Sequence, residues 1–280
     1  MIFFVAAIIF GAAIYLLFKY VGVKQLHLPT VVLFNYIICV VIGASGLILK
    51  ESEIIIHSKI IGASAIMGLL FVSMFYLMGM LTKQAGVATS SLISRVSLVI
   101  PALFFYFAWG ESLSHWAIVG ILLATVSIVL INNVKGKRLE LNGALPIIVF
   151  IGYGLVDVGL KLSQAAVEKL GNAHHELTLG IFFFAGTYGW VIKLIKGIKL
   201  EFRSTKSGVL LGAINYFSIY FFFLALERLS LPATVIFPLN GISIMLVATV
   251  FSILLFKESI TFKKLLALLL AAISIILMSN

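Results

Sequence analysis

Residues Leu265 to Met278 read Leu-Leu-Ala-Leu-Leu-Leu-Ala-Ala-Ile-Ser-Ile-Ile-Leu-Met. This run carries no charge, and polar and apolar positions do not alternate in it. A strand of a membrane β-barrel has about 10 residues of alternating polarity, whereas a helix that crosses the hydrocarbon core needs about 20 mainly apolar residues. With its flanking residues, the run therefore predicts a membrane-spanning helix.

Nine further apolar stretches of similar length precede this run. The ten predicted spans are Ile2 to Tyr20, Thr30 to Leu49, Lys59 to Leu81, Val87 to Trp109, His115 to Asn132, Gly143 to Leu162, Leu177 to Ile195, Ser207 to Leu226, Pro232 to Phe256 and Phe262 to Ser279. The connections between them are too short to hold a water-soluble domain. The sequence therefore predicts an all-α integral membrane protein.

The composition supports a membrane location and argues against a soluble fold. Hydrophobic residues make up 62% of the chain and charged residues 11%, against roughly 45–50% and about 25% in soluble domains. The net charge of +10 comes from Lys and Arg that lie mostly between apolar runs, where they report topology, so we expect no nucleic-acid partner. Cys39 is the one cysteine, and the five His residues lie near span ends without paired spacing. We therefore expect no disulfide, no metal and no cofactor.

An internal repeat divides the chain into two halves. Trp109-Gly-Glu111-Ser112 before the fifth span matches Phe256-Lys-Glu258-Ser259 before the tenth, an offset of 258 − 111 = 147 positions. The same offset pairs Phe104 with Phe251, Ser127 with Ser274 and Asn133 with Asn280. This predicts five-helix repeats over residues 1–135 and 136–280. Because five is odd, the second repeat enters the bilayer from the opposite side, an arrangement typical of secondary transporters with a site near the midplane.

The distribution of Lys and Arg predicts the orientation. Alternate connections hold fourteen in one set and five in the other, and Arg95 inside the fourth span completes the total of 20. Positively charged connections lie in the cytoplasm as a rule. The charge count therefore predicts both termini outside.

Several of these features together resemble the EamA-like branch of the drug/metabolite transporter superfamily. They are the five-plus-five arrangement, Lys19 and Lys161 at the ends of spans one and six, the stretch Val87-Ala-Thr-Ser-Ser-Leu-Ile-Ser-Arg-Val-Ser-Leu-Val-Ile-Pro101, and the two Glu-Ser boundaries. The resemblance covers the whole chain and implies an exporter in a bacterial inner membrane. Family members commonly carry an Arg early in span two, where this chain has Asn35-Tyr36. They also commonly have both termini in the cytoplasm, opposite to the charge count.

Two ionisable residues lie inside predicted spans, Arg95 in the fourth and Asp157 in the sixth. A charge at the bilayer centre costs about 2.5–3.5 kcal/mol on insertion scales and indicates a functional site. We expect Arg95 to bind a substrate carboxylate or phosphate. The alternatives are a structural ion pair or a side chain that extends to the membrane interface.

Asp157 follows Tyr153 by four residues and precedes Lys161 by four, so the three share a helix face. Either Asp157 and Lys161 form a local salt bridge, or Asp157 couples transport to proton movement. Tyr15 and Lys19 repeat half of this stripe. The other candidate ligands and cavity walls are Ser94, Asn215, Asn240, Tyr216 and Tyr220.

Two Pro and two Glu residues carry structural predictions. Pro101, and Pro238 with the following Leu-Asn-Gly, predict kinks in spans four and nine. Glu111 and Glu258 stand before helices, beside Ser or Thr, and are expected to cap helix starts.

The sequence thus predicts a secondary active transporter that exports a small polar or amphipathic metabolite, such as an amino acid, by alternating access. We find no Walker motif, nucleophile elbow or paired catalytic carboxylates, so neither ATP-driven transport nor enzymatic activity is expected. The expected partners are the substrate and the lipid bilayer, with the chain a monomer or homodimer. The rival interpretation is a lipid-handling or accessory membrane subunit.

Overall fold

The computed structural model describes residues 1–49, 57–110, 114–132, 144–168, 174–229 and 233–278. Within these ranges all regular structure is helical, which confirms the predicted all-α class. The helices are α1 (Ile2–Val23), α2 (Leu28–Leu49), α3 (Ser58–Ala85), α4 (Val87–Val96), α5 (Val99–Trp109), α6 (His115–Asn132), α7 (Ala144–Glu168), α8 (His174–Ile195), α9 (Phe202–Arg228), α10 (Ala233–Phe256) and α11 (Phe262–Met278).

Most of these helices have the length and composition of membrane spans. In the part of the chain that the structure describes, seven segments are long and apolar enough to cross a bilayer. They are α1, α2 to Gly46, α3, α4 together with α5, α7 to Ser163, α8 from Glu176, and α10 from Leu239. Long apolar helices that expose many large side chains are those of a membrane-integral protein.

The fourth predicted span is two helices, α4 and α5, joined at Ser97 and Leu98. Pro101 has no N–H to donate to the carbonyl of Ser97, one turn earlier. That carbonyl accepts from Ile100 N at 2.9 Å instead, which tightens the chain into an i to i−3 turn. The predicted kink at Pro101 is therefore confirmed.

The helix does not end at Pro238, since α10 runs without a break from Ala233 to Phe256; the predicted kink at this position stays a prediction. Pro238 lies in the second turn of that helix, where the missing N–H removes one hydrogen bond. The rest of the helix forms its ladder beyond that point.

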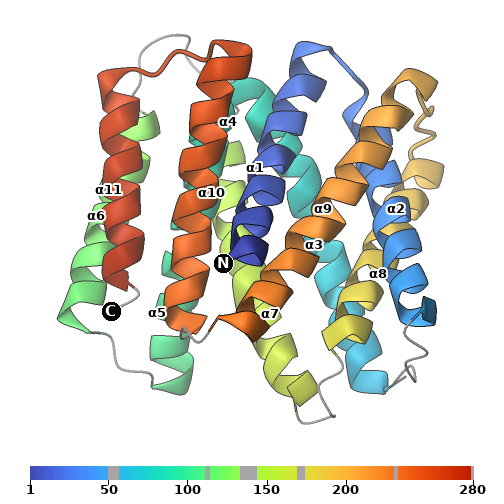
Figure 1. Ribbon diagram of the computed structural model, residues 1–280, viewed down its shortest axis with the longest axis horizontal. Coiled ribbons are helices and arrows are strands. Elements are labelled where there is room, and N and C mark those ends of the chain that lie inside the picture. Colours follow the sequence, from blue (N-terminus) through green and yellow to red (C-terminus); the bar gives the residue numbers. More distant parts are fainter. Residues whose placement is uncertain (50–56, 111–113, 133–143, 169–173, 230–232, 279–280) are drawn as a thin grey trace.

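The helices run roughly parallel or antiparallel to one another and form a bundle that is longer in one direction, with some helices in front of others (Figure 1). The pair α6 and α11 lies at one edge, α2 and α8 lie at the other, and α1, α4 and α10 stand between them. The main packing partners are α6 with α11, α2 with α8 and α9, α3 with α7 and α8, α1 with α9 and α10, and α4 with α10.

Four of the connections that the structure describes meet at one end: α1–α2, α3–α4, α8–α9 and α10–α11. The α1–α2 and α10–α11 connections are at the top of Figure 1. His27 N donates to Glu201 Oε2 at 3.0 Å, which joins the α1–α2 and α8–α9 connections, and Val87 N donates to Glu258 Oε2 at 3.1 Å, which joins the start of α4 to the α10–α11 connection. We call this the basic end, because its exposed side chains include Lys24, Lys83, Lys196, Lys199, Arg203, Lys206, Lys257 and Lys263.

Candidate functional site

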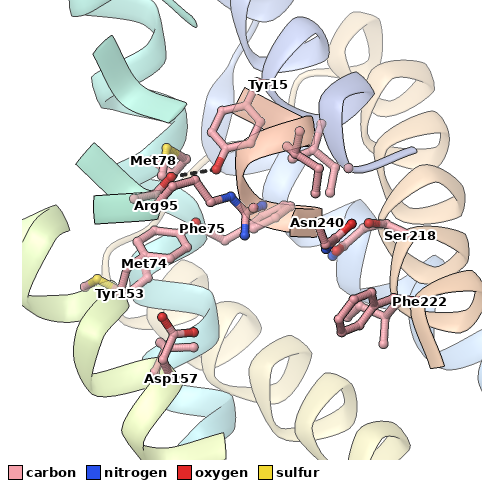
Figure 2. Close-up of a pocket in the computed structure, with 18 of the residues that line it drawn as sticks. Tyr15, Met74, Phe75, Met78, Arg95, Tyr153, Asp157, Ser218, Phe222 and Asn240 are labelled. Carbon is pink, nitrogen blue, oxygen red and sulfur yellow. Dashed lines mark hydrogen bonds between the residues drawn. The ribbon is translucent and has the colours of Figure 1, made fainter. Parts of the chain in front are cut away.

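A cavity of about 270 Å³ lies between α1, α3, α4, α7, α9 and α10 (Figure 2). Helices from both ends of the sequence therefore contribute to it. Six of the nine predicted site residues line this cavity: Arg95, Asn240, Asn215, Tyr153, Ser94 and Asp157. The structure thus brings together side chains that are up to 146 positions apart (240 − 94) in the chain.

Arg95 is the cation of the cavity lining, and it reaches the cavity from a short helix rich in serine. The serine hydroxyls bond to carbonyls of their own helix; Ser94 Oγ donates to Ser91 O at 3.1 Å and Ser97 Oγ to Ser94 O at 2.7 Å. Arg95 Nε is buried and has no hydrogen-bond partner. Among the described residues no carboxylate lies within ion-pair distance of Arg95, so the predicted structural ion pair is not seen there.

The Arg95 side chain extends from α4 toward Gly241 of α10. A Cβ atom at Gly241 of α10 would lie 3.4 Å from Arg95 Cδ, at ordinary van der Waals distance, so the arginine stem lies beside the α10 backbone at this point. Figure 2 shows the guanidinium extended into the cavity between Phe75 and Asn240. A guanidinium in this position presents several donors to an anionic ligand.

Asp157 is half-buried on α7, with its carboxylate directed into the cavity below Tyr153 (Figure 2). The structure shows no ion pair between Asp157 and Lys161, so the first of the two alternatives, a local salt bridge, is not seen there. Lys161 is exposed, does not line the cavity, and places its Nζ 4.0 Å from the centroid of the Phe105 ring. The long lysine stem reaches α5 more readily than it folds back toward a carboxylate one turn away. Lys161 is therefore not part of this site.

Two asparagines add amide groups to the cavity wall. Asn215 Nδ2 donates to the Oδ1 of buried Asn35 at 3.2 Å and to Cys39 Sγ at 3.7 Å, so the Asn215 amide nitrogen links α9 to α2. Asn240 Oδ1 is buried without a partner and can accept a hydrogen bond from a ligand. The predicted walls Tyr216 and Tyr220 do not line the cavity; their rings stack on each other with centroids 6.2 Å apart.

Several cavity residues were not predicted as ligands. Tyr15 Oη and Ser94 Oγ are hydrogen-bonded at 2.7 Å, which ties α1 to α4 beside Arg95. The stripe of Tyr15 and Lys19 gave a signal for this tyrosine. No sequence signal indicated the apolar wall of the cavity, because the chain has 23 Phe residues and their spacing does not single out a few of them. This wall includes Phe71, Met74, Phe75, Met78 and Phe222.

Glu258 caps a helix, as predicted, but not the helix that follows it in sequence. Its carboxylate accepts from Val87 N at the start of α4. The start of α11 is capped by Thr261 instead, whose Oγ1 accepts from Lys264 N at 3.3 Å. The sequence counterpart Glu111 lies outside the described residues.

The arrangement is suited to binding a small amphipathic molecule. The cavity offers a guanidinium, a carboxylate, amide and hydroxyl groups, and an apolar wall of aromatic and methionine side chains. Such a combination of mainly apolar lining and a few polar groups is typical of small-molecule sites.

Comparisons with known proteins give information on the fold but not on the chemistry of the cavity. No family model matches the chain. An uncharacterized protein of Haemophilus influenzae is 27% identical over 266 residues, which cover 91% of this chain and 89% of that protein. A protein of known crystal structure is 13% identical and superposes with a TM-score of 0.66 over 99% of this chain and 94% of its own. The chain therefore shares its overall fold with a protein whose structure has been solved.

Proposed function

We propose that this protein is a secondary active transporter of the EamA-like branch of the drug/metabolite transporter superfamily, and that it exports a small polar or amphipathic metabolite. The observation that carries this proposal is Arg95, whose buried Nε has no partner in a cavity built from both halves of the chain. A cation at membrane depth without an ion-pair partner among the described residues is costly. A ligand with a carboxylate or phosphate would remove that cost while it is bound.

The proposal includes ten spans in two inverted repeats, residues 1–135 and 136–280. In the proposed repeat the counterparts are α1 and α7, α2 and α8, α3 and α9, α4 and α10, and α6 and α11. The packing of the helices supports the repeat, because exchanging each helix for its counterpart reproduces the main contacts. The pair α1 and α9 becomes α7 and α3, the pair α2 and α9 becomes α8 and α3, and α1 with α10 becomes α7 with α4. The pairs α2–α8, α4–α10 and α6–α11 join counterparts to each other, as a two-fold axis in the membrane plane requires.

Within this proposal each polar group of the cavity has a role. Arg95 holds the anionic group of the substrate, and Asn215, Asn240, Tyr153 and Ser94 bind its other polar atoms. Asp157 carries the proton that couples substrate movement to a gradient. Phe and Met side chains of the wall contact the apolar part of the substrate.

The proposed location is a bacterial inner membrane with the basic end in the cytoplasm. Eight exposed Lys and Arg side chains of the described residues gather there, as the positive-inside rule requires. Both termini are then outside.

The test is the thermal stability of the purified protein in detergent across amino acids, nucleosides, sugars, amines and lipid head groups. A ligand at 100 times its Kd stabilises the folded state by about 2.7 kcal/mol. We expect one solute class to raise the unfolding temperature of the wild type and not that of Arg95→Ala. Arg203→Ala is the matched control, because Arg203 is exposed at the basic end, away from the cavity.

Two results would contradict this assignment. A solute that stabilises Arg95→Ala as much as the wild type would remove Arg95 from the site. Stabilisation by lipid alone would favour the rival function, a lipid-handling or accessory subunit, for which the apolar cavity wall would contact acyl chains.

A further inference from the structure

The cavity is sealed toward the basic end by buried side chains. Phe18 lies one turn beyond Tyr15 on α1, Leu92 one turn before Arg95 on α4, and Met245 one turn beyond Gly241 on α10. Phe18, Leu92 and Met245 are each 0% exposed. Small residues among them, Ala88 and Ala248, are also 0% exposed and let the helices approach closely. A solute in the cavity therefore cannot leave through this end unless α1, α4 and α10 separate.

One carboxylate joins these three helices just above the seal. Glu258 Oε2 accepts from Val87 N at 3.1 Å and from the hydroxyl of Ser252 on α10. Lys19 Nζ on α1 lies 3.8 Å from the same oxygen. Gly86 packs against the carboxylate, since a Cβ there would lie 2.0 Å from Glu258 Oε1. The negative charge stands at the start of α4, where the helix dipole stabilises it.

The helix held by Glu258 is short and carries the substrate-binding arginine. α4 has 10 residues and ends at the i to i−3 turn of Ser97 and Leu98. Such a turn inside a longer helix often marks a hinge. The start of α4 is thus fixed by the contact with Glu258, and its other end adjoins a turn that can bend.

We propose that Glu258 is a latch that keeps the cavity closed toward the basic end, and that α4 pivots at Ser97 and Leu98 when the latch opens. Opening breaks the contacts of Glu258 with Val87 N and Lys19 and frees the start of α4 to move away from α10. Arg95 moves with α4, so the same step changes the contact between Arg95 and the substrate. This inference rests on the proposed alternating-access function.

The test measures from which side of the membrane the cavity can be reached. Cys39 is replaced by Ala to remove the one native thiol, and Ser218→Cys places a thiol on the cavity wall. A membrane-impermeant maleimide is applied to intact cells and to inverted vesicles. Lys206→Cys, exposed at the basic end, identifies the side on which that end lies.

Glu258→Gln keeps the shape of the side chain and removes its charge. Its weaker hydrogen bond to Val87 N should raise labelling of the thiol at position 218 from the basic side by about tenfold, which corresponds to about 1.4 kcal/mol. Lys19→Met, which removes the cation and leaves the cap on Val87, should give a smaller rise. Glu176→Gln is the matched control, since this half-buried carboxylate lies in the first turn of α8, at the opposite end.

The readout separates a latch from a residue that only supports the fold. A merely structural cap predicts a lower unfolding temperature for Glu258→Gln with the same ratio of labelling from the two sides, and that result overturns the latch. If Glu258→Gln does not fold, an unchanged ratio in Lys19→Met overturns it as well. Loss of the latch leaves the transport proposal standing, because solute-dependent stabilisation through Arg95 is measured independently.

Discussion

Replacing Gly86 by alanine tests the contact between Glu258 and the start of α4 without touching either group. Gly86 has φ +88° and ψ 172°, a conformation that is essentially restricted to glycine. The new Cβ would also lie 2.0 Å from Glu258 Oε1 and 2.8 Å from Glu258 Cδ. The carboxylate must therefore move, although Val87 N, Ser252 and Lys19 hold it in place.

The expected loss of stability has two parts. Holding a non-glycine residue in such a backbone conformation costs about 1–3 kcal/mol. Displacing Glu258 removes a charge-assisted hydrogen bond to Val87 N, which contributes about 1.5–3 kcal/mol. We therefore expect Gly86→Ala to lower the free energy of unfolding by about 2.5–6 kcal/mol.

Two other glycines separate these contributions. Gly110 has φ +67°, and a Cβ added there would have nothing within 4 Å, so Gly110→Ala should cost only the backbone strain, about 1–2 kcal/mol. Gly62 lies in α3 with open space around it, and Gly62→Ala should be neutral or stabilising by up to about 1 kcal/mol. The assay is reversible denaturant unfolding of each variant in detergent micelles.

The double variant Gly86→Ala/Glu258→Ala completes a thermodynamic cycle. With the carboxylate gone, the alanine at position 86 should cost only its backbone strain, so the two changes should be less than additive. Additive losses, or a Gly86→Ala loss no larger than that of Gly110→Ala, would refute the contact-based reasoning.

Two further predictions concern other helix contacts. Hydrogen bonds from the Ser204 hydroxyl and the His27 amide lower the pKa of Glu201 below its ordinary value of 4.5. The stability that this carboxylate contributes is therefore fully present above pH 4.5, and it is lost as the pH falls through the lowered pKa. Glu201→Gln should consequently be less stable than the wild type near neutral pH, and the unfolding temperatures of the two should converge in acid; a constant difference would contradict this. Gly152→Ala would place a Cβ 1.9 Å from Met74 Sδ and should cost about 1–3 kcal/mol of stability and weaken solute binding, because Met74 lines the cavity; unchanged stability and binding in the same solute assay would show that Met74 yields freely.

The positions of charged and polar residues along the chain predicted much of the candidate site. Arg95 and Asp157 stand out because ionisable groups are rare inside apolar spans, and both line the cavity. The same reasoning failed for Lys161, which shares a helix face with Asp157 but extends to Phe105. Helical spacing gives the direction in which a side chain leaves the helix, and a lysine stem is long enough to reach a different neighbour.

Local sequence predicted a kink at two prolines; one helix ends close to Pro101, and the other continues past Pro238. At Pro101 the missing N–H coincides with a serine-rich helix whose hydroxyls already bond to backbone carbonyls, and such bonding often bends helices. At Pro238 the helix continues. A proline removes one hydrogen bond in both places, and the surrounding packing decides whether the helix ends there.

The sequence by itself determined that this is a helical protein of the membrane, because hydropathy and the lack of polar alternation are properties of each segment alone. Only the tertiary structure decided which phenylalanines and methionines form the cavity wall, and that Glu258 caps α4 rather than α11. The physical reason is that helices apolar on most faces carry little information about their rotation or neighbours. Those depend on contacts between residues far apart in the chain, such as the 171 positions between Val87 and Glu258.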